Sequence, residues 1–175
     1  RVDRRLGDPD DFAALVTRAH ERGIRIMLDG VFNHVGRDFP MFQTALQEGP
    51  DSAAAQWFRM TWPHSGDAEP EYDHFEGHRQ LVTLNHANEQ VADFVVEVMC
   101  HWLERGADAW RLDAAYAVPA TFWSRVLGSR LASALRWSDP NAAVRLLEES
   151  LALMTRAPFG PLTWISASSA SMAAG

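Results

Sequence analysis

The sequence predicts an α/β fold in which parallel strands are connected by helices. Two observations predict it. An amphipathic helix, a glycine turn and a short apolar strand occur in this order in residues 8–28 and again in residues 88–112, and a further helix follows the second strand. Repetition of this kind is typical of parallel sheets with right-handed helical crossovers. In such folds the chemistry gathers at the carboxyl ends of the strands.

The first helix is expected to begin at Asp8, an N-cap residue placed directly before Pro9. Asp is a favoured N-cap, and Pro is favoured at the first helical position because its missing N–H would have no partner there. Gly23 supplies a left-handed stop. Between these signals an apolar stripe runs at helical spacing: Phe12, Leu15, Val16 and Ala19.

The second helix is the more strongly amphipathic of the two. Its apolar stripe follows the i, i+3, i+4, i+7 pattern: Val91, Phe94, Val95, Val98, Met99, Trp102 and Leu103. Gly106 closes it after Glu-Arg, as Gly23 closes the first helix after Glu-Arg. Pro119 is expected to open the further helix. Trp102 and Trp110 lie on predicted buried elements and are expected in the core.

Polar side chains follow both predicted strands, which cover residues 24–28 and 107–112. Four of them stand at or just beyond the carboxyl ends of these strands: Asp29, Asn33, His34 and Asp113. Each taken alone has an ordinary structural explanation, such as capping the turn that follows a buried strand. Their joint occurrence after two neighbouring strands is what favours a functional site.

Residues 36–87 form an irregular insert, far longer than the usual connection of roughly 4–6 residues. His74 and His78 in this insert are four residues apart, which raises zinc binding as an alternative. Gly77 and the lack of helical periodicity disfavour it. We therefore expect an insert with small elements of its own and no zinc site.

The overall composition excludes several classes of protein. The formal net charge is −7 and every basic residue is Arg, without a basic cluster, which argues against nucleic acid or an anionic membrane surface as a partner. Cys100 is the only cysteine and cannot form an internal disulfide. No apolar run approaches the roughly 20 residues of a membrane helix.

Two segments resemble motifs of the α-amylase family of glycoside hydrolases (glycoside hydrolase family 13). The segment Asp-Gly-Val-Phe-Asn-His at 29–34 is similar to the motif after the third barrel strand, and Gly-Ala-Asp-Ala-Trp-Arg-Leu-Asp at 106–113 is similar to the motif that ends the fourth strand. Leu84-Asn85 resembles the short signature before the fourth helix, and residues 1–11 resemble the stretch after the second strand. The resemblance covers residues 1–127. It implies a partial (β/α)8 TIM barrel, about strands 3 to 5, with the irregular insert after the third strand.

The resemblance also implies roles for individual residues. Asp113 would be the catalytic nucleophile, and Arg111, two residues earlier on the same strand, would point to the same face and support it through a charge-assisted hydrogen bond. His34 would bind a sugar hydroxyl, and Asp29 would fix the geometry around Arg111 and His34. Asn33 matches a calcium ligand, so a structural calcium is expected without being required for the chemistry.

The aromatic residues of the insert have two interpretations. They either stack on sugar faces or pack the core of the insert, and core packing is at least as well supported by the sequence. These residues are Trp57, Trp62, Tyr72 and Phe75.

A retaining glycosidase also needs a second carboxyl group as acid/base, about 5–5.5 Å from the nucleophile. Glu149, with Glu148 as the alternative, stands at the expected distance along the chain, at the end of a candidate strand at residues 142–147, but without the expected preceding Gly. Serine becomes frequent and acidic residues rare after Gly128, which suggests the hypothesis of a shifted reading frame there. Residues 166–175 are expected to be poorly ordered.

The predicted organisation is a barrel unit at 1–35, the insert at 36–87, a second barrel unit at 88–127 and a divergent tail at 128–175. The intact enzyme is expected to carry out retaining hydrolysis or transglycosylation at α-glucosidic bonds of an α-glucan, a maltooligosaccharide or a related α-glucoside. The chain itself is expected to be weakly active or inactive. The alternatives are a non-catalytic carbohydrate-binding or interaction module, and a non-functional truncated product. A cytoplasmic location and a truncated N-terminus are expected.

Overall fold

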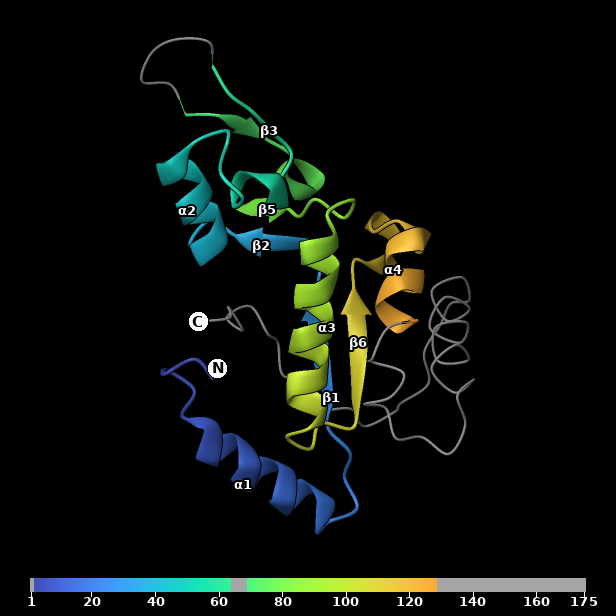
Figure 1. Cartoon of the computed structure of the whole chain (residues 1–175). Coiled ribbons are helices and arrows are strands. Elements are labelled where there is room, and N and C mark those ends of the chain that lie inside the picture. The colour runs from blue at the N-terminus through green and yellow to red at the C-terminus, as the bar shows by residue number, and fades with distance from the viewer. Residues whose placement is uncertain (1, 64–68, 129–175) are drawn as a thin grey trace.

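A computed structural model describes residues 2–63 and 69–128 of the chain (Figure 1). The helices are α1 (Pro9–His20), α2 (Pro40–Glu48), α3 (Glu89–Leu103) and α4 (Ala120–Leu127), with short 3-10 helices η1 (Ala55–Trp57), η2 (Phe75–Gly77) and η3 (Ala115–Ala117). The strands are β1 (Met27–Val31), β2 (His34–Gly36), β3 (Met60–Thr61), β4 (Glu71–Tyr72), β5 (Leu81–Thr83) and β6 (Ala109–Asp113). The tail, with the candidate strand at 142–147, lies outside these residues.

The two strands β1 and β6 pair in parallel, which confirms the predicted α/β class. The register places Asp29 opposite Arg111 and Val31 opposite Asp113. Because both strands run in the same direction, their carboxyl ends meet at one edge. Figure 1 shows the insert beyond this edge and α1 at the opposite end of the pair.

Both strands begin later than predicted, and β1 also ends later, at Val31. The strand expected at 24–28 begins at Met27, and the strand expected at 107–112 begins at Ala109. The cause is Asp108, whose carboxylate accepts the N–H of Ile26 at 2.7 Å and whose own N–H donates to the Ile26 carbonyl at 2.8 Å. These bonds occupy the position of the first ladder pair. Because β1 continues to Val31, Asp29 lies in the middle of this strand and not at its end, whereas Asp113 ends β6 as predicted.

The helix signals in the sequence are confirmed. Asp8 caps α1 through hydrogen bonds from the N–H groups of Asp10 and Asp11. Gly23 and Gly106 both adopt positive φ, +69° and +96°. A Cβ on Gly106 would also lie 2.7 Å from Cγ1 of Val16. Position 106 therefore favours glycine for two reasons: the positive φ and the lack of space for a side chain.

The apolar stripe of α1 is only partly buried. Val16 is buried, but Leu15 is 54% exposed. Phe12 packs edge-on against Trp102 with 4.8 Å between ring centroids. Around this contact lies a small cluster in which three of the described residues are buried, Leu28, Trp102 and Ala107, and Trp110 packs against it while partly exposed. The prediction is confirmed for Trp102, whereas α1 presents part of its apolar stripe to solvent.

The insert contains regular structure and a core of its own. Strands β2 and β5 form one antiparallel pair, and β3 and β4 form another. Phe42 of α2 is fully buried and meets Phe58 and Tyr72 edge-on, with centroid distances of 5.1 and 5.0 Å. Trp57 and Tyr72 are buried in the same cluster, so they are core residues and not sugar platforms. Trp62 packs partly buried against this core.

The first and last residues of the insert region lie close together in space. The carbonyl of Asn33, just beyond β1, accepts the N–H of Leu84 at 3.0 Å. The buried His86 donates from Nε2 to the Phe32 carbonyl at 3.0 Å. These bonds connect the end of β1 with the segment that leads into α3. Among the described helices, none is long and apolar enough to cross a membrane.

Candidate active site

One guanidinium group connects the two predicted carboxylates across the parallel pair. Arg111 Nη1 donates to Asp29 Oδ1 at 2.5 Å, and Nη2 donates to Asp113 Oδ1 at 3.0 Å. The β6 spacing of two residues puts Arg111 and Asp113 on one face, and the register brings Asp29 opposite Arg111. The hydrogen bond to Asp29 raises the pKa of Arg111; burial opposes this, and the charges of Asp29 and Asp113 add to the increase.

The backbone turns sharply directly after Asp113. Ala114 adopts a left-handed conformation, with φ 49° and ψ 28°, and η3 begins at the next residue. Asp29 is the more enclosed carboxylate, with 13% of its side chain exposed against 38% for Asp113. Asp29 therefore serves as the inner anchor of Arg111, while Asp113 presents its carboxylate to the open side of the site.

The residues after β1 bring an imidazole to the same edge. Asn33 is 1% exposed, and its amide lies 3.3 Å from Nδ1 of His34. The His34 ring stacks on Phe75, with a centroid distance of 4.8 Å and an interplanar angle of 19°. Burial lowers the pKa of His34, while the negative charges of Asp113 and Glu76 act in the opposite direction. His34 is thus a mostly neutral imidazole held near Asp113.

Two further residues of this edge are missing from the sequence-based prediction. Tyr116, three residues after Asp113, donates its hydroxyl to Oε1 of Glu76 at 2.9 Å. This hydrogen bond raises the pKa of Tyr116, and the charge of Asp113 adds to the effect. No sequence signal predicts the contact, because the two residues are 40 positions apart and Glu76 lies in a segment without periodicity.

The acid/base and metal roles predicted from the sequence involve three other residues: Glu148, Glu149 and Asn33. Glu148 and Glu149 lie outside the described residues. In the described ranges 2–63 and 69–128, no group of three or more His, Cys, Asp or Glu side chains is placed to hold a metal ion. The calcium role of Asn33 stays a prediction.

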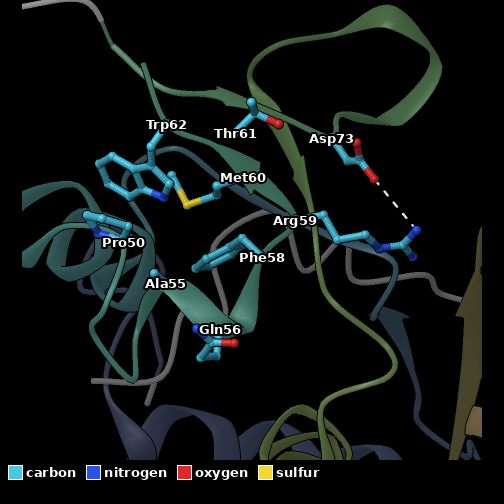
Figure 2. Close-up of a pocket in the computed structure, with 9 residues that line it drawn as sticks. All are labelled: Pro50, Ala55, Gln56, Phe58, Arg59, Met60, Thr61, Trp62 and Asp73. Atoms are coloured by element: carbon cyan, nitrogen blue, oxygen red, sulfur yellow. Dashed lines mark ion pairs between the residues drawn. The ribbon is translucent and has the colours of Figure 1, made fainter. Parts of the chain in front are cut away.

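A hollow of about 400 Å³ lies within the insert and is separate from these residues (Figure 2). Arg59 and Asp73 form an ion pair at 3.7 Å on one side of it, and Trp62 and Met60 lie on the other. None of Asp29, His34, Arg111 and Asp113 lines it. These four residues instead lie on β1 and β6 and just beyond the end of β1.

Two parallel strands with helices before and after them, and with carboxylates and an arginine that lead to the carboxyl end of β6, place the chain in the α/β class. The sequence model described as "Alpha amylase, catalytic domain" matches residues 1–127. The chain therefore belongs to the α-amylase family of glycoside hydrolases, whose catalytic domain is a (β/α)8 barrel.

Relatives and solved structures agree with this assignment. The chain is 39% identical over 124 residues to a cyclomaltodextrinase of Geobacillus thermopakistaniensis and 38% identical over 124 residues to an intracellular maltogenic amylase of Bacillus subtilis, with 70% of this chain and 21% of each relative covered. A solved cyclic α-maltosyl-(1→6)-maltose hydrolase from Arthrobacter globiformis in complex with maltose superposes with a TM-score of 0.66 at 34% identity, over 77% of this chain and 30% of that one. The chain thus spans about a fifth of the length of these curated relatives.

Proposed function

We propose that Asp113 is the nucleophile of a retaining enzyme that hydrolyses or transfers α-glucosidic bonds. The observation that carries the proposal is the bridge Asp29–Arg111–Asp113, which starts in the middle of β1 and ends at Asp113, the last residue of the parallel strand β6. A retaining mechanism needs an ionised carboxylate in a fixed position, because it must attack the anomeric carbon as positive charge develops there. Arg111 holds Asp113 by a charge-assisted hydrogen bond, and Asp29 holds Arg111.

The other residues receive supporting roles in this proposal. His34 would donate a hydrogen bond to a sugar hydroxyl next to Asp113, consistent with its place beside that carboxylate. Glu149, or Glu148, is the proposed acid/base that protonates the leaving oxygen. β1 and β6 would correspond to the third and fourth strands of the barrel. The chemistry needs no cofactor, and a calcium ion at Asn33 would be structural.

The proposed substrate is a neutral oligosaccharide of α-linked glucose. Relatives named cyclomaltodextrinase, maltogenic amylase and cyclic α-maltosyl-(1→6)-maltose hydrolase support this class. The negative net charge of the chain is compatible with such a neutral ligand. The cytoplasm is the proposed location, supported by the relative from Bacillus subtilis that is named as intracellular.

The nucleophile can be tested apart from the acid/base with α-glucosyl fluoride. Fluoride leaves without protonation, so the reaction needs only attack by the Asp113 carboxylate: the C1–F bond breaks, an ester bond from Asp113 to C1 forms, and fluoride departs with the electron pair. Without a competent base the ester accumulates, and intact-mass spectrometry of the full chain would show the addition of one glucosyl unit, located on Asp113 by peptide mapping. Asp113→Asn should reduce adduct formation by about a thousandfold or more.

Maltotriose provides the complementary measurement, because its leaving group does require a proton. We expect the chain to turn over maltotriose very slowly or not at all. Robust turnover that Asp113→Asn abolishes would contradict this expectation of weak activity while supporting Asp113 as the nucleophile. Failure of the wild-type chain to form any adduct with the fluoride, while it still binds maltotriose, would reject the catalytic role and favour a carbohydrate-binding module.

A further inference from the structure

The bend between β1 and β2 determines where the imidazole of His34 lies. β1 ends at Val31 and β2 begins at His34, so only Phe32 and Asn33 lie between the two strands. Asp29 stands on the strand before this bend, and His34 comes directly after it. The direction of the backbone at the bend therefore sets the position of the imidazole relative to the carboxylate–arginine bridge on β1 and β6.

Both peptide groups of this bend are bonded from one short segment, the one that leads into α3. The N–H of Leu84 donates to the Asn33 carbonyl at 3.0 Å, and Nε2 of His86 donates to the Phe32 carbonyl at 3.0 Å. Because a peptide group is planar, a bond that fixes its oxygen also fixes the orientation of the whole group. The two peptide planes that precede His34 are thus both held by the same segment.

The two bonds differ in what the sequence must supply. The main chain makes the bond from Leu84, and any residue except proline can make it. The bond to the Phe32 carbonyl depends on the side chain of His86. Burial lowers the pKa of His86, which favours the neutral ring with a single N–H. Since a carbonyl can only accept, that proton lies on Nε2.

The rings around the bend show what the histidine adds. The Phe32 ring packs against Trp110 of β6 and Trp123 of α4, with centroid distances of 5.6 and 6.4 Å. His86 is 5% exposed and meets Phe122 of α4 edge-on at 4.8 Å. An apolar side chain of similar size could fill the same space against Phe122. The contribution that needs a histidine is therefore the bond that orients the Phe32 carbonyl.

We propose that His86 is a positioning residue, which acts through the Phe32 carbonyl to hold His34 beside Asp113. The buried imidazole acts through the bend and needs no contact with the substrate. This inference rests on the proposed function, in which His34 binds a sugar hydroxyl next to the nucleophile.

The test compares three substitutions of His86 in the full 175-residue chain. His86→Leu keeps an apolar side chain of similar size and leaves the Phe32 carbonyl without its donor. The rate of adduct formation with α-glucosyl fluoride should fall by about tenfold, as expected when a binding group loses its orientation. His86→Gln, whose amide N–H can replace Nε2–H, should stay within about threefold of the wild-type rate. His86→Asn, whose amide is too short to replace it, should behave as His86→Leu does, and it serves in its place if His86→Leu does not fold.

The His34 ring provides a second readout, which needs no reaction. It stacks on Phe75 with 4.8 Å between centroids and an interplanar angle of 19°, so the ring current of Phe75 shifts its carbon-bound proton signals upfield. His86→Leu should move these signals toward the positions of an exposed histidine, whereas His86→Gln should leave them in place. The spectrum of His34→Gln, which lacks the signals, identifies them.

Two controls separate positioning from a general loss of stability. Val95→Ala removes part of a fully buried side chain of α3, so it should lower the urea midpoint without changing the adduct rate or the His34 signals. His101→Leu makes the same chemical change at a partly buried histidine near the end of α3, and it should leave both readouts unchanged.

The outcomes for this inference and for the proposed function are distinct. Unchanged His34 signals in a folded His86→Leu chain would overturn the positioning role, and so would equal losses in His86→Leu and His86→Gln. If the wild-type chain forms no adduct with the fluoride, the nucleophile is rejected. The His34 signals then decide alone: signals that move in His86→Leu and return in His86→Gln support the role of His86, and signals that do not move overturn it.

Discussion

The parallel pair β1–β6 and the insert between them differ in what holds them together. The insert belongs to a large buried cluster that it shares with α3 and α4, and it contains fully buried side chains such as Phe42 and Val82. The cluster below the parallel pair has three buried residues, and β6 is only partly buried along its length. In the described residues, β1 and β6 pair only with each other. The candidate site residues thus lie on the less buried region, the parallel pair, and most of the apolar packing lies in the neighbouring cluster that includes the insert.

A large-to-small substitution in each of the two clusters tests this difference first. Phe42→Ala should lower the free energy of unfolding by about 3–5 kcal/mol, because the fully buried ring leaves a cavity among Phe58 and Tyr72. Leu28→Ala, in the small cluster, should cost about 2 kcal/mol, at the low end for a buried Leu, since few buried neighbours surround it. Urea denaturation followed by circular dichroism measures both. A larger loss for Leu28→Ala would reverse the comparison.

The parallel pair should be more sensitive to added volume than its exposure suggests. A Cβ on Gly30 would lie 2.5 Å from Cε2 of Phe32 and 3.1 Å from Cε3 of Trp110. Gly30→Ala should therefore lower the free energy of unfolding by about 1–3 kcal/mol through overpacking. Gly36→Ala is the control, because a Cβ there meets nothing within 4 Å. Equal urea midpoints for the two variants would show that Phe32 moves aside without cost.

The bridge between the carboxylates should affect reactivity more than stability. Asp29→Asn removes the inner anchor of Arg111, whose side chain is 53% exposed, so the loss of stability should be small because solvent screens the pair. The rate of adduct formation with α-glucosyl fluoride should fall by about ten- to a hundredfold, as expected when a reacting group loses its orientation. Asp3→Asn, which removes an ion pair with Arg5 outside the site, is the control. An unchanged rate for Asp29→Asn would mean that Arg111 keeps its position without Asp29.

The smallest expected effect concerns pH. Burial lowers the pKa of His86 from its usual 6.5, partly offset by its bond to the Phe32 carbonyl. Because the unfolded chain binds a proton at this residue more readily than the folded chain, stability should fall as pH drops from 7.5 through 6.5, and level off below the folded pKa. Urea midpoints at pH 7.5 and 5.5 would show this fall, and His86→Gln should make it shallower. His34 and His101 have lowered pKa values for the same primary reason and act in the same direction.

The sequence predicted the parallel region better than it predicted the insert, for a physical reason. Strand alternation and the pairing of two strands determine where three site residues lie: Asp113, Arg111 and Asp29. Both features follow from the periodicity of the sequence. The start of β1 was predicted wrongly because a side chain, Asp108, takes the hydrogen bond that a strand neighbour would otherwise take. Glu76 reaches Tyr116 only through a left-handed turn in a folded insert, and no local pattern encodes a contact over 40 residues.

The hydrogen bonds at the base of the insert have a consequence for how the insert can change in evolution. The bonds from Leu84 to Asn33 and from His86 to Phe32 close the excursion at its base, so the two points where it departs and returns are fixed next to each other. Lengthening or exchanging the segment between them adds little loop-closure entropy and places no strain on β1. Recombination between related genes at these two points would therefore exchange the insert and leave the parallel pair β1–β6 with Asp113 unchanged.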